Sequence, residues 1–288
     1  MNQELLLIQG SQPDWGLQHK ASQLAEDAKL TMKAVSIAGL EKTTPDDSLL
    51  AKALMPYAAN ARIILAPATV RLRCIMPMLA WHLQAGLTAD CTHLSISETG
   101  LLQQTRPAFG NSLMATIETI GQIQMATVRP GTFPPPETPG SMDLNLTSIS
   151  GASLVRLIRQ VAGKEEAPIG QAQIIVAGGA GIGSREGFSK LTVFARQIGG
   201  SVGASRNAVD AGYAPYSAQV GMTGTTVCPK LYIAVGISGA VQHLAGMSGS
   251  GTVIAINSDP KAPIFQYADF GIVGDWEPII DQLMEEFV

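Results

Sequence analysis

The chain of 288 residues contains few cysteines, and its apolar stretches are short. Three cysteines, Cys74, Cys91 and Cys228, have neither metal-ligand spacing nor an evident pairing, which predicts buried structural thiols in a reducing compartment. The apolar stretches fall short of the roughly 18–20 residues that cross a bilayer. The amino terminus is too acidic for a signal peptide and lacks the arginines of a transit peptide. Together these absences predict a cytoplasmic protein without membrane insertion.

Charge and aromatic residues are also sparse. Charged residues make up 15% of the chain, the net charge is −4, and the basic residues form no stripe, so nucleic-acid binding is not expected. Hydrophobic residues reach 46% with only 5% aromatics, and there are 30 glycines. This composition predicts layered α/β packing with many tight turns between strands and helices. The length suffices for two domains of roughly 150 residues each.

In the first half of the chain, strand and helix patterns alternate. Strands are predicted over 5–9, 33–37 and 62–66, and helices over 15–30, 49–58 and 75–85 with Gly86 as the stop. Residues 92–133 predict antiparallel hairpins, and the prolines between Pro130 and Pro139 predict an exposed connector. Residues 144–163 are expected to hold a strand and a helix. Residues 164–168 resemble a linker, which divides the chain into domains 1–165 and 166–288.

Two continuous apolar runs, 231–235 and 252–256, predict neighbouring strands of a parallel sheet that helices cover on both faces. A short helix is expected to start at Gly236-Ile237-Ser238-Gly239. Free N–H groups and the positive end of the helix dipole would suit a phosphate or pyrophosphate there. The second run ends in Asn257 and Asp259, at the carboxyl edge where α/β folds bind ligands. These features predict a dinucleotide site.

Residues 174–184 read as a strand, a glycine turn and the start of a helix. The spacing Gly179-x-Gly181-x-Gly183 permits a close approach of the backbone to a ligand, or tight packing of the strand against the helix. The glycines alone leave open whether this turn binds a ligand or only connects two elements.

Several separate blocks of the chain carry a resemblance to a known family. They are G-A-S-R-N-A-V-D-A-G at 203–212, Q-V-G-M-T-G at 219–224, G-I-S-G-A-V-Q-H-L-A-G-M at 236–247, A-I-N-S-D-P-K-A-P-I-F at 255–265 and A-D-F-G-I-V-G-D at 268–275. The first half adds L-T-A-D-C-T at 87–92, T-R-P-A-F-G at 105–110 and Q-M-A-T-V-R-P-G-T-F at 124–133. In this order they resemble the alpha subunits of electron-transfer flavoproteins, from about residue 60 onward.

The resemblance implies an α/β fold with a Rossmann-like N-terminal domain and a flavodoxin-like, doubly wound C-terminal domain that binds FAD. It further implies a heterodimer with an electron-transfer flavoprotein beta subunit. Such a carrier takes electrons from flavoprotein dehydrogenases, such as acyl-CoA dehydrogenases of fatty acid beta-oxidation, and passes them to a quinone-linked or other acceptor. Since the flavin performs the chemistry, no catalytic acid–base pair and no metal are expected.

The same resemblance assigns the residues that contact the cofactor. His243 is placed at the pyrimidine edge of the flavin, Asn257 and Asp275 at the adenosine half, whereas Asp210 and Asp269 are expected to be structural. The complete expected set is Ala180, Ser205, Arg206, Gln219, Val220, Gly221, Met222, Thr223, Ser238, Gly239, Ala240, Val241, Gln242, His243, Asn257 and Asp275.

Three positions depart from the family pattern. Ala180 stands where the family usually has an arginine, Met222 replaces a glutamine, and Thr225 stands where a lysine is usual. A guanidinium beside the flavin would stabilise negative charge on the reduced ring, so its loss predicts less positive surroundings. Arg185 or Arg206 is the alternative source of that charge.

Two other function classes remain open at this stage. One is a nicotinamide-dinucleotide-binding redox domain, although a strict G-x-G-x-x-G followed by an acidic residue about twenty positions later is missing. The other is a non-redox adenine-nucleotide-binding scaffold subunit that has lost flavin. Electron-bifurcating and nitrogen-fixation-associated variants of the family also remain open. Visible flavin absorbance separates the carrier from the non-flavin alternatives.

Overall fold

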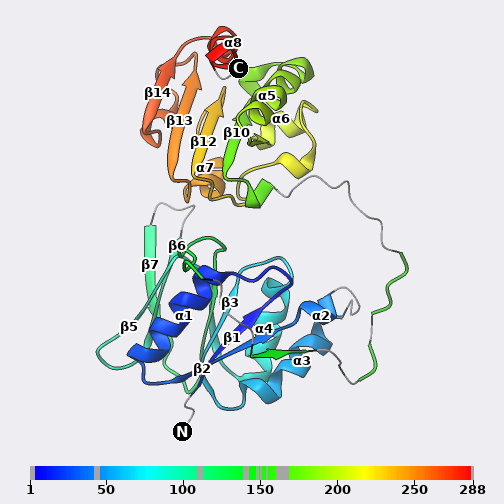
Figure 1. The fold of residues 1–288 in the computed structure, drawn as a ribbon, viewed down its shortest axis with the longest axis vertical. Helices are drawn as coiled ribbons and strands as arrows, with labels where there is room; N and C mark the ends of the chain where they lie inside the picture. The colour runs from blue at the N-terminus through cyan, green and yellow to red at the C-terminus, as the bar shows by residue number, and fades with distance from the viewer. Residues whose placement is uncertain are drawn as a thin grey trace. The chain divides into compact units, whose positions relative to one another are not determined.

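The computed structural model describes residues 4–41, 46–108, 113–138, 143–146, 149, 151–153, 155–159 and 169–286. Contacts within the chain define two compact units, Met1–Ala162 and Gly163–Val288 (Figure 1). The predicted boundary at residue 165 and the predicted linker 164–168 lie outside the described residues. Each unit is built around its own parallel sheet, which confirms the expected two-part α/β fold.

The N-terminal unit contains a parallel sheet with the order β4-β8-β3-β1-β2-β9. Its strands are β1 (Glu4–Gln9), β2 (Thr31–Ser36), β3 (Ala61–Pro67), β4 (Gly86–Cys91), β8 (Gln124–Val128) and β9 (Leu144–Asn145). A second, antiparallel sheet joins β5 (His93–Ile96), β6 (Leu102–Ala108) and β7 (Leu113–Glu118). The helices are α1 (Trp15–Asp27), α2 (Ala38–Glu41), α3 (Asp47–Ala58) and α4 (Leu72–Leu83).

Strand β1 shows how the parallel sheet is covered on both faces. Leu5 and Leu7 pack in one core with α1 and the β5–β6 hairpin, while Leu6 and Ile8 pack in a second core with α3 and α4. Both sets are completely buried. Because successive side chains of a strand point to opposite faces, a strand covered on both faces reads as a continuous apolar run.

Three details of this unit differ from the sequence-based prediction. Residues 124–128 form a fully buried strand between β3 and β4 of the parallel sheet rather than part of a hairpin. The helix before Gly86 ends at Leu83, where Gln84 takes the left-handed conformation with φ 51, and Gly86 begins β4. Between residues 143 and 159, the described part of the chain contains the two-residue strand β9 and no helix.

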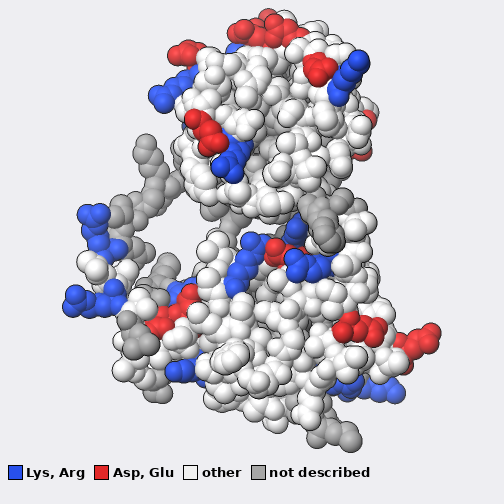
Figure 2. All heavy atoms as spheres, turned by 180° about the vertical axis from the view of Figure 1, so that it is seen from behind, with Lys and Arg blue, Asp and Glu red and all other residues white. Residues whose placement is uncertain are grey.

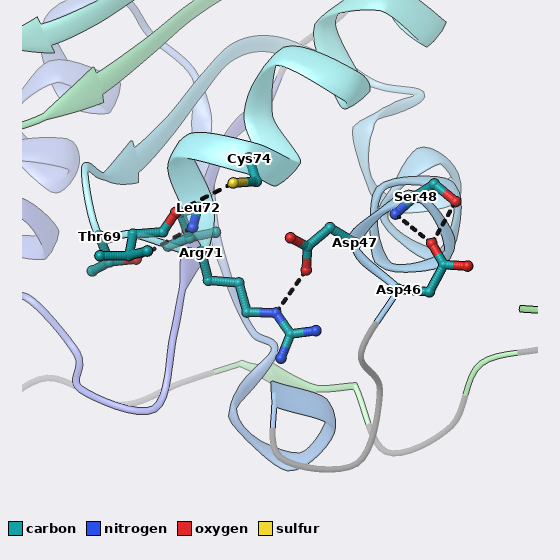
Figure 3. Close-up of polar contacts among 8 residues, drawn as sticks. Asp46, Asp47, Ser48, Thr69, Arg71, Leu72 and Cys74 are labelled. Atoms are coloured by element: carbon teal, nitrogen blue, oxygen red, sulfur yellow. Dashed lines mark hydrogen bonds and ion pairs between the residues drawn. The ribbon is translucent and has the colours of Figure 1, made fainter. Parts of the chain in front are cut away.

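Polar contacts hold the starts of α3 and α4 beside the carboxyl end of β3 (Figure 3). The Asp46 carboxylate accepts from the Ser48 amide at 3.0 Å, and the Arg71 guanidinium bonds Asp47 at 2.8 Å. The nearby Cys74 thiol donates to the Val70 carbonyl at 3.6 Å. The prediction that all three cysteines are buried is confirmed for Cys91, but it is wrong for Cys74, which is exposed on α4, and for Cys228, which is partly exposed.

At the carboxyl end of β1, the polar groups of Gln9 and Asp14 hydrogen-bond to one another and to the start of α1. The fully buried Gln9 amide donates to the Asp14 carbonyl at 3.0 Å and accepts from the Asp14 amide at 3.1 Å. The Asp14 carboxylate caps α1 by accepting from the Leu17 amide at 2.9 Å. A carboxylate therefore occupies the N-terminus of the first helix.

The C-terminal unit contains five parallel strands in the order β11-β10-β12-β13-β14. They are β10 (Ile174–Gly178), β11 (Ser201–Ala204), β12 (Leu231–Val235), β13 (Thr252–Asn257) and β14 (Phe270–Val273). This is the 2-1-3-4-5 order of flavodoxin-like sheets. α5 (Arg185–Gln197), α6 (Arg206–Asp210) and α8 (Trp276–Glu286) contribute to the core on one face, and α7 (Val241–Met247) to the core on the other.

On the face that Figure 2 presents, acidic and basic side chains lie beside one another on both units. Within the described part of the chain, no helix combines the length and apolarity that crossing a membrane requires. The same residues include no group of three or more His, Cys, Asp or Glu side chains that could hold a metal ion.

Candidate cofactor-binding site

The candidate site begins at the carboxyl ends of β10 and β12. The chain leaves β10 to one side for β11 and returns on the other side for β12, so a crevice forms between the ends of β10 and β12. Gly179 and Gly236 follow these two strands directly. A Cβ atom on Gly179 would lie 2.0 Å from the Gly236 oxygen, and Gly236 itself has φ 63. The two turns approach to a distance that only glycine allows.

A pocket of about 650 Å³ opens at this crevice, within the range of about 300–1,000 Å³ that small-molecule sites occupy. Four segments of the C-terminal unit contribute its walls. They are residues 179–181, residues 205–207 with Asp210, residues 220–223, and residues 236–238 with Ala240, Gln242 and His243.

The loop over residues 219–224 rests directly on the backbone of α7. The Met222 amide donates to the Gln242 carbonyl at 2.7 Å, and the Val227 amide donates to the Gly246 carbonyl at 2.8 Å. A Cβ atom on Gly246 would lie 2.3 Å from the Gly221 nitrogen. The absence of a side chain at Gly246 therefore allows the 219–224 loop, which forms one wall of the pocket, to pack directly against α7.

The turn before α7 is longer than the sequence pattern predicts. The helix begins at Val241 instead of at residues 236–239, because Gly236 and Gly239 have positive φ values of 63 and 89. Ser238 and Ala240 line the pocket, whereas a Cβ atom on Gly239 would lie 2.4 Å from the Ile264 nitrogen. Gly239 thus packs this turn against its neighbour and does not line the pocket.

Ser205 and Arg206 stand at the start of α6, and both line the pocket. The Ser205 hydroxyl caps the helix by accepting from the Ala208 amide at 3.3 Å. The Arg206 guanidinium lies 3.3 Å from the Asp210 carboxylate, with exposed fractions of 65% and 62% for the two side chains. Such an exposed pair contributes about 0.3–0.5 kcal/mol. Asp210, expected only to support the loop, is also part of the pocket wall.

The structure separates the two arginines that were candidates to compensate for Ala180. Arg206 lines the pocket together with Ala180, which begins the short 3-10 helix η2 (Ala180–Ile182). Arg185 instead donates to the Gly212 carbonyl at 2.6 Å and is not part of the pocket wall. Any guanidinium charge supplied from this wall therefore comes from Arg206.

Gln219 supports the loop from behind. Its buried amide donates to the Thr223 hydroxyl at 2.9 Å, while Val220, Gly221, Met222 and Thr223 themselves line the pocket. Met222 is 57% exposed and presents a thioether where the family pattern has a glutamine amide.

His243 is buried in the first turn of α7, and its Nε2 atom lies 2.9 Å from the Tyr232 hydroxyl. Burial lowers the pKa of His243 to about 4, and the Val220 backbone offsets part of that shift. Among the described residues, the buried Nδ1 atom has no hydrogen-bond partner. A buried polar atom without a partner, on a residue that lines a pocket, suits a ligand that supplies the missing bond.

Besides Gln219 and Gly239, three more expected contact residues lie outside the pocket wall. Asn257 ends β13, where its amide donates to the Ile237 carbonyl at 2.8 Å and so supports the turn before α7. Asp275 follows β14 and accepts from the Glu277 amide at 3.3 Å. Val241 is half exposed at the start of α7. Because β13 and β14 lie beyond β12 in the sheet, Asn257 and Asp275 stand farther along the carboxyl edge from the crevice.

The pocket wall also contains residues that the expected set omits. Gly179, Gly181 and Gly236 carry a signal in the sequence, since each belongs to a glycine turn after an apolar strand. Ile237 lies inside the predicted turn 236–239, whereas Asn207 carries no such signal, and only the fold places it in the wall. Asp269, expected to be structural, accepts from the Val253 amide at 2.8 Å and ties the loop before β14 to β13.

Comparison with known proteins agrees with this geometry in both units. A model described as "Electron transfer flavoprotein domain" matches residues 15–154, and one described as "Electron transfer flavoprotein FAD-binding domain" matches residues 168–248. The electron transfer flavoprotein subunit alpha of Thermoanaerobacterium thermosaccharolyticum is 49% identical over 245 residues, which are 82% of this chain and 74% of that protein. The chain belongs to the electron transfer flavoprotein alpha subunit family.

Two further proteins are similar to this chain. The subunit alpha of Paracoccus denitrificans is 35% identical over 273 residues, or 92% of this chain and 84% of that protein. A protein named Protein FixB from Clostridium saccharobutylicum is 45% identical over 240 residues, or 79% of this chain and 71% of that protein.

The cofactor of this chain is FAD, and the residues at the crevice fit it. All four pocket segments fall within the matched FAD-binding domain. Glycine turns permit close approach to the cofactor, Arg206 offers a cation, and His243 has a buried polar atom that lacks a partner. When bound, the flavin supplies the redox chemistry, while the protein binds, orients and tunes it.

Proposed function

We propose that the chain is the alpha subunit of a heterodimeric electron carrier, paired with an electron transfer flavoprotein beta subunit. It would accept electrons from flavoprotein dehydrogenases, such as acyl-CoA dehydrogenases, and deliver them to a quinone-linked or other acceptor in the cytoplasm. The observation that carries this proposal is the pocket at the crevice between β10 and β12, whose four wall segments all lie inside the matched FAD-binding domain. The individual contacts, including those of Asn257 and Asp275 with an adenosine half, belong to the proposal.

The N-terminal unit supports pairing with another subunit. Large apolar side chains stand exposed on it, including Leu113 and Met114 on β7, Ile120 after that strand, and Trp81 on α4. Exposed apolar groups of this size are typical of surfaces that a partner covers. We therefore assign to domain 1–165 the packing against a beta subunit, and to domain 166–288 the binding of FAD.

The first prediction concerns the cofactor. The full chain co-expressed with a beta subunit should purify with visible flavin bands, and denaturation should release non-covalent FAD. Under anaerobic conditions, an acyl-CoA dehydrogenase with its substrate should reduce this flavin. Finding FMN, or no flavin after FAD is added during refolding, contradicts the proposal. Reduction by a nicotinamide nucleotide alone would favour the nicotinamide-binding alternative, and nucleotide without flavin would favour the scaffold.

A second prediction concerns the charge beside the flavin. Ala180→Arg should raise the flavin reduction potential by the equivalent of about 1–3 kcal/mol, because a guanidinium favours the reduced ring when it carries negative charge. Arg206→Ala should lower the potential less, because Asp210 already offsets the Arg206 charge. A dye-coupled potentiometric titration measures both shifts. Arg185→Ala, outside the pocket wall, is the control and should leave the potential unchanged. A large loss in Arg206→Ala with no gain in Ala180→Arg would show that Arg206 already supplies the charge.

A further inference from the structure

Tyr232 links the buried centre of the C-terminal sheet to the wall of the pocket. It lies on β12, completely buried, on the sheet face where Leu244 and Met247 of α7 pack. Its hydroxyl is 2.9 Å from His243 Nε2, and the two rings are tilted by 58° with their centroids 6.2 Å apart. Within the described part of the chain, this is the hydrogen bond that the structure gives the Tyr232 hydroxyl.

The positions of the protons follow from counting donors and acceptors. If the Tyr232 hydroxyl donates to Nε2, the neutral imidazole carries its proton on Nδ1. The Val220 backbone lies near enough to the ring to offset part of its pKa shift, but with the residues that the structure describes Nδ1 makes no hydrogen bond of acceptable geometry, so the Nδ1–H group is the single buried group left without a partner. If Nε2–H donates instead, the Tyr232 proton and the Nδ1 lone pair are both left without partners. Each unmet buried polar group is costly, so the first arrangement is favoured.

Burial keeps the His243 imidazole neutral and the Tyr232 phenol protonated, as this assignment of the protons requires. Burial lowers the pKa of His243 to about 4, so its ring is neutral near pH 7 and its tautomer is chemically meaningful. Burial also raises the pKa of Tyr232, so the phenol retains the proton that it donates.

We propose that Tyr232 is a positioning residue, which holds His243 in the tautomer with its proton on Nδ1 and so makes that N–H group a donor to an acceptor atom of the cofactor. The identity of that acceptor as part of FAD rests on the proposed function, whereas the tautomer is a property of the chain alone. A fixed Nδ1–H donor favours ligands that place an oxygen or an unprotonated nitrogen, which can accept its hydrogen bond, beside His243.

The tautomer is tested in the full chain without added cofactor. In a protein labelled with ¹⁵N-histidine, the NMR spectrum of His243 at neutral pH should show a protonated Nδ1 and an unprotonated Nε2. Tyr232→Phe removes only the hydroxyl and should bring the Nε2–H form into view. Tyr267→Phe, at an exposed tyrosine of the same unit, should leave the spectrum of His243 unchanged. A wild-type His243 with its proton on Nε2, or a tautomer that Tyr232→Phe does not change, overturns the proposal.

The consequence for binding is tested with FAD and the co-expressed beta subunit. Tyr232→Phe should weaken FAD binding by about tenfold, the value of one ordinary hydrogen bond. In a His243→Ala background, Tyr232→Phe should cause little further loss, because the two residues act through one donor. Independent, additive losses overturn the positioning role. If wild-type protein binds no FAD, the proposed function fails, and the NMR experiment still decides the tautomer. If Tyr232→Phe does not fold, the wild-type NMR spectrum alone still decides which nitrogen of His243 carries the proton.

Discussion

Replacing Gly246 with alanine should destabilise the protein by about 3 kcal/mol, although the same change in a helix ordinarily stabilises by about 1 kcal/mol. The added Cβ would lie 2.3 Å from the Gly221 nitrogen and 2.4 Å from its Cα, both backbone atoms that cannot rotate away. The 219–224 loop would have to leave α7, and it carries Val220 to Thr223 of the pocket wall. Urea denaturation should show the loss of stability, and a titration with FAD should show weaker binding.

Gly274→Ala is the matched control for this variant. Gly274 belongs to the same unit, and a Cβ there would meet only the flexible end of Ile279 at 3.3 Å. This change should alter stability by no more than about 0.5 kcal/mol. If Gly246→Ala were as well tolerated as Gly274→Ala, the direct backbone contact between the loop and α7 would be wrong.

Acid should destabilise the cofactor-free protein through His243 by about 3 kcal/mol as the pH falls from 6.5 to 4. The unfolded chain binds a proton on this ring near its ordinary pKa of 6.5, whereas burial lowers the pKa in the folded state to about 4. Between these values the unfolded state holds more protons, so stability decreases as the pH falls. Above pH 6.5 the contribution is fully present and constant. Denaturation midpoints measured across this range provide the test.

The variant His243→Gln separates this residue from the carboxylates that also titrate in acid. It should flatten the slope of stability against pH between 6.5 and 4, even if it lowers stability at neutral pH. His93→Gln, at an exposed histidine, should leave the slope as in wild type. Equal slopes in all three proteins would mean that the folded state accommodates a protonated His243.

The sequence predicts an element well where its environment is uniform. Strand β12 begins and ends at the predicted residues, because burial on both faces demands an unbroken apolar run. The place of β8 in the parallel sheet is not predicted, because the polar residues Gln124 and Thr127 make its sequence resemble a strand of an exposed hairpin. In the fold both are buried, and the Gln124 side chain accepts from the Leu102 amide at 2.5 Å. That contact depends on a neighbouring hairpin whose position no local pattern encodes.

The candidate site is predictable at the level of segments and less so for single residues. The three expected segments over 205–206, 219–223 and 238–243 all meet at the crevice, since parallel strands bring their carboxyl ends to one edge. The distance of each strand from the crevice is set by sheet order, which the spacing along the chain does not reveal. Asn257 shows the consequence, because its amide already bonds Ile237 and supports the site from the next strand.

The two units share a further geometric property, since each has its first strand between its second and third, β1 between β2 and β3 and β10 between β11 and β12. In the C-terminal unit, glycines follow that first strand. In the N-terminal unit, the Asp14 carboxylate sits at the start of α1 and has already taken up the Leu17 amide. A phosphate brought there would meet a like charge and a donor already in use. Equivalent topology therefore does not give equivalent ligand sites, because the carboxylate at the start of α1 disfavours the anionic ligands for which the C-terminal crevice is suited.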